Sequence, residues 1–143
     1  MYMASLVASK FSVVTVRPRI VPLIEKAVLQ SGLGAKCVSI RSINVSVLDT
    51  ENNPELTEKE LLSESKKAIE CDRAEAICLG CSGMVKFAQE LEEKLDIPVF
   101  DGVVSAVKLA EALVDMRKQT SKLYSYKYPE KKMYKGVAEK LTP

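Results

Sequence analysis

The chain has 143 residues, of which 47% are hydrophobic and 28% charged, and its formal net charge is +2. These values are typical of a single soluble domain that is long enough to bury a core, and they exclude collagen-like, coiled-coil and low-complexity classes. No apolar run approaches the ~18–20 residues that cross a bilayer, so we expect no membrane segment and no membrane partner. Residues 1–10 lack the basic stretch that opens a signal peptide, and we therefore expect a cytoplasmic protein.

Histidine is absent from the sequence. Its absence excludes Ser-His-Asp and Cys-His sites and any metal held by histidine, so acid–base chemistry near neutral pH must use Cys, Lys, Tyr, Asp or Glu. Because the chain needs no staples and has no export signal, we expect its cysteines to be reduced. They are not spaced as a zinc site requires, and we expect no metal. The four cysteines are Cys37, Cys71, Cys78 and Cys81.

Apolar strands alternate with amphipathic helices along the chain. The expected elements are a strand over 11–16, a helix over 20–28, a strand over 37–43, a loop over 45–54, a helix from 57 to about 71, a strand over 76–79, a turn over 80–83, a helix over 84–95, a strand over 97–100 and a helix over 103–114. Thr57 and Glu60 fit a capping box at the start of the second helix. Four strand–helix pairs with short connections predict an α/β fold: a four-stranded, mostly parallel sheet with helices on both faces.

Ligands of such sheets bind outside the carboxyl ends of the strands. The Thr15 hydroxyl ends the first strand and can bind a ligand oxygen, although threonine is also common in ordinary strands. Asp101 follows the last strand and either holds a ligand or caps the final helix, and the cap is favoured. Arg41 and Asp49 are expected to form a structural ion pair.

The turn over 79–84, Leu-Gly-Cys-Ser-Gly-Met, joins a strand end to a helix start. We expect the amides of Ser82, Gly83 and Met84 to be free donors at the helix N-terminus, aimed above the sheet. A thiol in this position can have its pKa lowered from about 8.5 to about 3.5–7.5, so Cys81 is a candidate nucleophile or general acid–base. The alternative is a small buried cysteine at a tight turn.

Cys78 and Cys81 also form a C-x-x-C motif. A redox dithiol is disfavoured, because Cys78 lies inside a strand whose pleat directs it to a different face from Cys81. No glycine-rich phosphate-binding motif occurs.

The segment over 118–143 holds seven lysines, two glutamates and four of the five tyrosines. This composition fits nucleic-acid binding, but no nucleic-acid module accompanies it, and we expect no nucleic-acid partner. A strap with tyrosine anchors and solvated lysines is the favoured interpretation. We therefore predict an α/β lobe over 1–117 and a basic tail over 118–143 that packs on the lobe or on a partner.

Together these motifs resemble the hydantoin racemase branch of the aspartate/glutamate racemase superfamily, from about Ala4 to Val114. The family often has alanine at the position of Ser82. The matching stretches are Phe-Ser-Val-Val-Thr over 11–15 with the prolines at 18 and 22, Arg41 with Val-Leu-Asp over 47–49, Leu-Gly-Cys-Ser-Gly-Met over 79–84, and Pro-Val-Phe-Asp-Gly-Val over 98–103 with Ala-Val-Lys-Leu-Ala-Glu over 106–111.

The resemblance implies a racemase that needs no cofactor, built from two similar lobes, in which one cysteine from each lobe faces the substrate carbon. Cys81 corresponds to the cysteine of the second lobe. Backbone groups around Ser82 and Gly83, and the Val14–Thr15 region, would bind oxygens of a small hydantoin-like or amino-acid-like substrate and stabilise the carbanion.

This chain is shorter than the family pattern, and the first-lobe cysteine is not in it. We therefore expect either a homo-oligomer or pairing with a separate first lobe. The alternatives are an inactive or split-gene lobe with a binding role, and a decarboxylase or isomerase of the same superfamily that uses a single cysteine.

Overall fold

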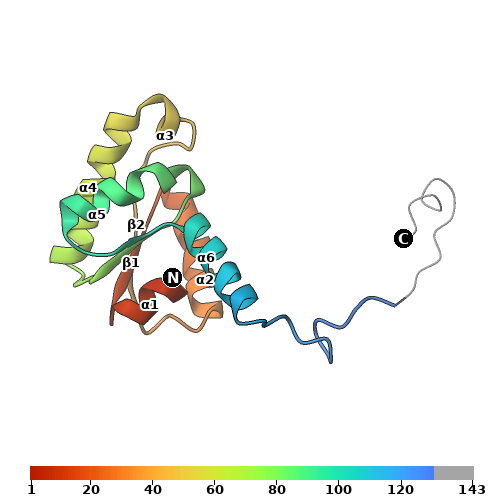
Figure 1. Ribbon diagram of the computed structural model, residues 1–143. Helices are drawn as coiled ribbons and strands as arrows, with labels where there is room; N and C mark the ends of the chain where they lie inside the picture. Colours follow the sequence, from red (N-terminus) through yellow and green to blue (C-terminus); the bar gives the residue numbers. More distant parts are fainter. Residues whose placement is uncertain (131–143) are drawn as a thin grey trace, which may run out of the picture. The chain divides into compact units, whose positions relative to one another are not determined.

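The computed structural model describes residues 1–130, and the chain divides after Leu109 into two units, the first of which is Met1–Leu109. The first unit contains the whole sheet (Figure 1). Within the described residues, no helix is long and apolar enough to cross a membrane.

Four parallel strands form the sheet, in the order β2-β1-β3-β4. They are β1 (Phe11–Thr15), β2 (Cys37–Ser42), β3 (Ala76–Leu79) and β4 (Val99–Phe100). Every residue of β1 and β3 is buried, as expected of central strands that are covered on both faces. The predicted α/β class and parallel sheet are thus confirmed.

Helices cover both faces of this sheet (Figure 1). One face packs against α4 and α5, and the other against α1 and α2. In chain order the helical segments are α1 (Tyr2–Val7), the 3₁₀ helix η1 (Pro18–Ile20), α2 (Val21–Gln30), α3 (Asp49–Asn52), α4 (Pro54–Glu70), the 3₁₀ helix η2 (Ser82–Phe87), α5 (Ala88–Leu95) and α6 (Gly102–Asp115).

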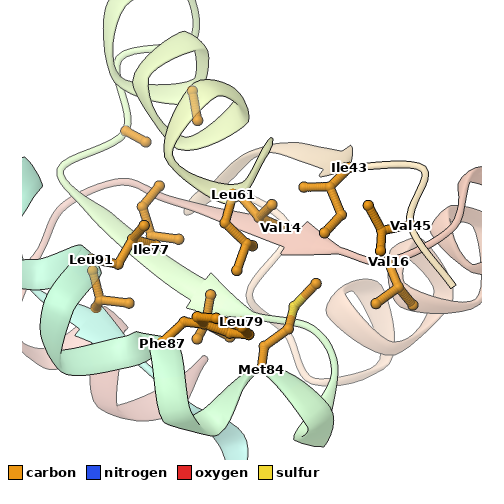
Figure 2. Close-up of a cluster of buried hydrophobic side chains, with 13 residues drawn as sticks. Val14, Val16, Ile43, Val45, Leu61, Ile77, Leu79, Met84, Phe87 and Leu91 are labelled. Carbon is orange, nitrogen blue, oxygen red and sulfur yellow. The ribbon is translucent and has the colours of Figure 1, made fainter. Parts of the chain in front are cut away.

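The larger hydrophobic core lies between the sheet and α4–α5 (Figure 2). Val14 from β1 and Ile77 from β3 point into it, and Leu61 of α4 and Leu91 of α5 pack over them. Because side chains alternate along a strand, Val13 and Cys78 point the opposite way, into the smaller core beneath α1 and α2.

Two predictions about the segment between β2 and β3 were wrong. The loop expected over 45–54 contains the single turn α3, and α4 begins at Pro54 rather than at a Thr57 cap. Proline is well suited to the first helical position, since it has no N–H to satisfy there. Thr57 is instead fully buried inside α4, and its hydroxyl donates to the carbonyl oxygens of Asp49 and Asn53.

The expected pair of Arg41 with Asp49 was also wrong. Arg41 donates from Nε and Nη2 to the two carboxylate oxygens of Asp72, at 2.6 and 2.9 Å, and from Nη1 to Glu64 at 3.3 Å. The Arg41 guanidinium holds the pKa of the Asp72 carboxyl below its usual range. The Asp49 carboxylate accepts a hydrogen bond from the Ser46 amide, which fixes the start of α3.

The predicted basic tail begins at Lys118, and its residues over 131–143 lie outside the described part of the chain. Tyr124, Tyr126 and Tyr128 are exposed. The packing of this tail on the lobe or on a partner stays a prediction, as does the border at 117/118.

The core contacts predict a large difference between two leucines of α4. Replacing fully buried Leu61 by alanine should lower the free energy of unfolding by about 2–5 kcal/mol, because a cavity is left in the core. Leu56→Ala on the same helix, at a side chain 49% exposed, is the matched control and should cost much less. Urea unfolding followed by circular dichroism measures both, and equal losses would contradict the packing.

Candidate functional site

The carboxyl ends of the two central strands, β1 and β3, lie side by side. Val14 pairs with Leu79 in the parallel register, and the next amide, that of Gly80, donates to the Val14 carbonyl oxygen at 2.8 Å. The Thr15 hydroxyl lies 3.4 Å from the Gly80 carbonyl oxygen, to which it donates. The chain therefore leaves β3 in direct contact with the end of β1.

Gly80 leaves little room for a side chain. A Cβ there would lie 3.0 Å from Cβ of Thr15 and 3.1 Å from both Cδ1 of Ile24 and Cγ1 of Val13. These contacts are tighter than most Cβ atoms make, so a larger residue would require its neighbours on β1 and α2 to shift by a few tenths of an ångström. The close packing of Gly80 thus determines the position of the backbone of the next residue, Cys81.

Cys81 is extended, with φ −145° and ψ 132°, and caps η2. The segment after it is a 3₁₀ helix and not the α-helix expected over 84–95, which begins only at Ala88. The Met84 amide donates to the Cys81 carbonyl oxygen at 3.0 Å, so the prediction that it is free was wrong. In the described part of the chain, the amides of Ser82 and Gly83 make no hydrogen bond within the protein.

Gly83 provides a second close approach, beside the sulfur. A Cβ at Gly83 would lie 3.8 Å from Cys81 Sγ and 3.0 Å from Oγ1 of Thr50 on α3. Thr50 is fully buried and donates to the Val47 carbonyl oxygen at 2.6 Å. The turn α3 therefore packs over the cysteine turn and limits how it can move. The turn α3 was not predicted from the sequence. The signal that was missed is Ser46, whose hydroxyl accepts a hydrogen bond from the Asp49 amide at 3.1 Å, at the start of this turn.

A cavity of about 370 Å³ opens beside the cysteine turn. Cys81, which is half-buried, and exposed Ser82 line it at the end of β3. Most of the remaining wall is apolar. Its other lining residues are Met1, Val13, Ile24, Ala27, Cys78, Leu79, Gly80, Phe100, Asp101, Gly102 and Val103.

Of the other predicted site residues, Asp101 lines this cavity, whereas Val14, Thr15 and Gly83 do not. Val14 is fully buried in the larger core, and its carbonyl oxygen holds Gly80. Thr15 is also fully buried, against Gly80. Their predicted contact with a substrate, like that of Gly83, stays a prediction. Asp101 caps α6, as was favoured: its Oδ1 accepts the amides of the second and third residues after it, at 3.0 and 2.8 Å.

The four cysteines have different surroundings. Burial raises the pKa of the Cys78 thiol, and burial together with the nearby Cys78 raises the pKa of Cys37 to about 11. Cys78 packs in the smaller core and Cys81 packs against the larger one, and both line the cavity at the end of β3. Cys71 is exposed. Within residues 1–130, no three Cys, Asp or Glu side chains gather as ligands of a metal ion.

Comparison with known proteins gives a consistent result. Residues 1–110 match the family model described as Asp/Glu/hydantoin racemase. The chain is 51% identical over 138 residues to a hydantoin racemase of Pseudomonas sp. (strain NS671), a match that covers 96% of this chain and 55% of that protein. A hydantoin racemase of Rhizobium meliloti is 42% identical over 133 residues and is also covered to 55%.

Solved structures show the same relationship. The allantoin racemase from Klebsiella pneumoniae has a TM-score of 0.89 and 36% identity, with 99% of this chain and 58% of that chain covered. For the allantoin racemase from Pseudomonas fluorescens the TM-score is 0.86 and the identity 37%, with 94% and 57% covered. This chain thus spans just over half the length of the relatives that it matches.

The surroundings of the cysteines predict their order of alkylation. With limiting iodoacetamide at pH 7.5, exposed Cys71 and cavity-lining Cys81 should react well before Cys37 and Cys78. The thiolate is the nucleophile, and a raised pKa leaves less of it at this pH. Peptide mass spectrometry over time measures the order. Early labelling of Cys78 would show that the smaller core is open.

Proposed function

The chain belongs to the Asp/Glu/hydantoin racemase family, and from this premise we propose that it forms one side of a racemase site, which needs no cofactor, for hydantoin-like carbon acids. Cys81 carries the proton in this proposal. The observation that carries it is the position of the Cys81 sulfur, half-buried on the wall of a cavity where β3 ends. Ligands of parallel sheets bind at this edge.

Racemisation of a carbon next to a carbonyl group proceeds by loss of its proton. The C–H electron pair then delocalises onto the carbonyl oxygen, which leaves a flat, enolate-like anion. A thiolate at position 81 takes the proton in one direction, and the thiol returns a proton to the same face in the other. The amides of Ser82 and Gly83 are the nearest donors for the oxygen on which the negative charge develops, and this stabilises the anion.

Inversion also needs a proton carrier on the opposite face of the anion. Cys78 lines the same cavity but is a poor candidate, because it is only 4% exposed and burial raises its pKa. Cys37 and Cys71 do not line the cavity. We therefore assign the second carrier to another polypeptide: either a second copy of this chain or one corresponding to the part of the relatives outside the match.

A reaction with a single thiol is the second candidate function. Loss of CO₂ from a malonate-like acid leaves a similar anion, which Cys81 alone protonates from one face. The specific observation in its favour is that, of the two cysteines that line this cavity in the described residues, Cys81 is half-buried and Cys78 is buried. Both reactions require a reduced thiol, which agrees with the proposed cytoplasmic location.

The proposal predicts the effect of removing the sulfur. Cys81→Ala should lower racemisation of a 5-substituted hydantoin at least ~10²-fold, the usual contribution of a positioned acid or base. Polarimetry of one pure enantiomer measures the rate, with the chain alone and with a polypeptide that supplies the unmatched part of the Pseudomonas hydantoin racemase.

Cys71→Ala is the matched control, because Cys71 is exposed and remote from the cavity. It should keep the full rate. Equal rates for the Cys81→Ala variant and the unmodified chain would exclude Cys81 as the proton carrier. Release of CO₂ from a malonate-like acid without racemisation would favour the second candidate.

A further inference from the structure

The inner part of the cavity beside Cys81 has an apolar floor. Val13 pairs with Cys78 and Cys78 with Phe100 in the parallel register, so the three form a row across β1, β3 and β4. Their side chains belong to the smaller core, and Val13 and Cys78 are only 2% and 4% exposed. A group that passes Cys81 toward this row therefore meets the hydrocarbon of Val13 and Phe100 and the buried thiol of Cys78, beside which the Met1 amino group lies.

One wall of this inner part comes from α2. Ile24 and Ala27 are three residues apart on that helix, so they share a face, and both line the cavity. Cδ1 of Ile24 lies 3.1 Å from the point where a Cβ on Gly80 would be. The end of the Ile24 side chain thus lies against the backbone immediately before Cys81, where the inner part of the cavity meets the cysteine turn.

The one carboxylate on the cavity wall is already engaged. Asp101 accepts the amides of both Val103 and Val104, and its side chain is therefore directed to the start of α6. The other polar groups of the lining are on Cys81 and Ser82, and the amino group of Met1 lies beside the Cys78 thiol. Away from these groups, beside Val13, Ile24 and Phe100, a charged or strongly polar substituent would lose its hydration without gaining partners.

We propose that Ile24 is a specificity-determining residue, which limits the size of an apolar substituent carried by the reacting carbon. The proposal rests on the proposed function, which supplies the identity of the molecule that binds in the cavity. When that carbon lies beside the Cys81 sulfur, its substituent extends over Gly80 toward Val13 and Phe100, and Ile24 restricts the passage. Ile24→Ala removes three carbons at this restriction, and Ile24→Phe adds bulk there.

The test uses the reactivity of Cys81 and needs no turnover. The chain is alkylated with iodoacetamide or with N-benzyl-iodoacetamide, and peptide mass spectrometry gives the rate at Cys81, with exposed Cys71 as the internal reference. We compare the alkylation rate of Cys81 by N-benzyl-iodoacetamide with that by iodoacetamide. Ile24→Ala should raise this ratio about tenfold, because a few carbons in an apolar pocket change selectivity by about that factor. Ile24→Phe should lower this ratio.

Leu23→Ala is the matched control, since Leu23 is the preceding residue of α2, is 65% exposed and does not line the cavity. It should leave the ratio unchanged. An unchanged ratio in both Ile24 variants, with circular dichroism showing that they fold, would overturn the proposal.

A second measurement separates this proposal from the proposed function. In the racemisation assay, Ile24→Ala should raise kcat/KM for 5-benzylhydantoin relative to 5-methylhydantoin. If neither compound racemises while the alkylation ratio still shifts, the proposed function fails and the assignment of Ile24 as the size limit of the cavity stands. If both racemise with an unchanged preference, the role of Ile24 fails and the proposed function stands.

Discussion

The close approach of β3 to β1 and α2 at Gly80 is the constraint on which the rest of the site depends. A Cβ at this position would make contacts of 3.0–3.1 Å, tighter than most Cβ atoms make, so glycine fits there without a shift of its neighbours. The same approach allows the Gly80 amide to bond the Val14 carbonyl oxygen, which extends the ladder one residue beyond the strand. Cys81 is consequently held at the sheet edge by backbone contacts, and its own side chain remains free to face the cavity.

The four cysteines share a residue type but differ in their surroundings, and the surroundings determine which of them the proposed chemistry can use. Cys78 and Cys81 are three residues apart, yet the pleat and the turn place them against different cores. Burial raises the pKa of Cys78, whereas Cys81 is half-buried on the wall of the same cavity. In the proposed reaction a flat anion exposes two faces, and Cys81 serves one of them. The proposal therefore assigns the other face to a second polypeptide.

Local sequence patterns predicted the sheet and the cysteine turn, because apolar β-branched runs and glycines act over a few residues. The predictions were wrong where contacts with residues distant in the sequence determine the local structure. Arg41 binds Asp72, which follows α4, and no local spacing indicates that pair. Thr57 does not cap α4, because Pro54 already starts the helix, and its hydroxyl donates back to the carbonyl oxygens of Asn53 and Asp49. The sequence did not predict the 3₁₀ form of η2, because the spacing of its apolar residues fits an α-helix equally well. The position of Ile24 over Gly80 likewise depends on how α2 packs.

The central claim is that two proton carriers act on opposite faces of the anion and that Cys81 is one of them. Its most direct test is hydrogen exchange at the reacting carbon in deuterated water. A single enantiomer of a 5-substituted hydantoin is followed in D₂O by chiral separation and mass spectrometry. The account predicts that the newly formed enantiomer carries deuterium while the remaining substrate keeps its protium. The carrier that removes the proton can return only that protium to the same face, whereas the opposite carrier delivers a solvent-derived deuteron. Deuterium that enters the remaining substrate as fast as the product would contradict it, because one carrier would then serve both faces.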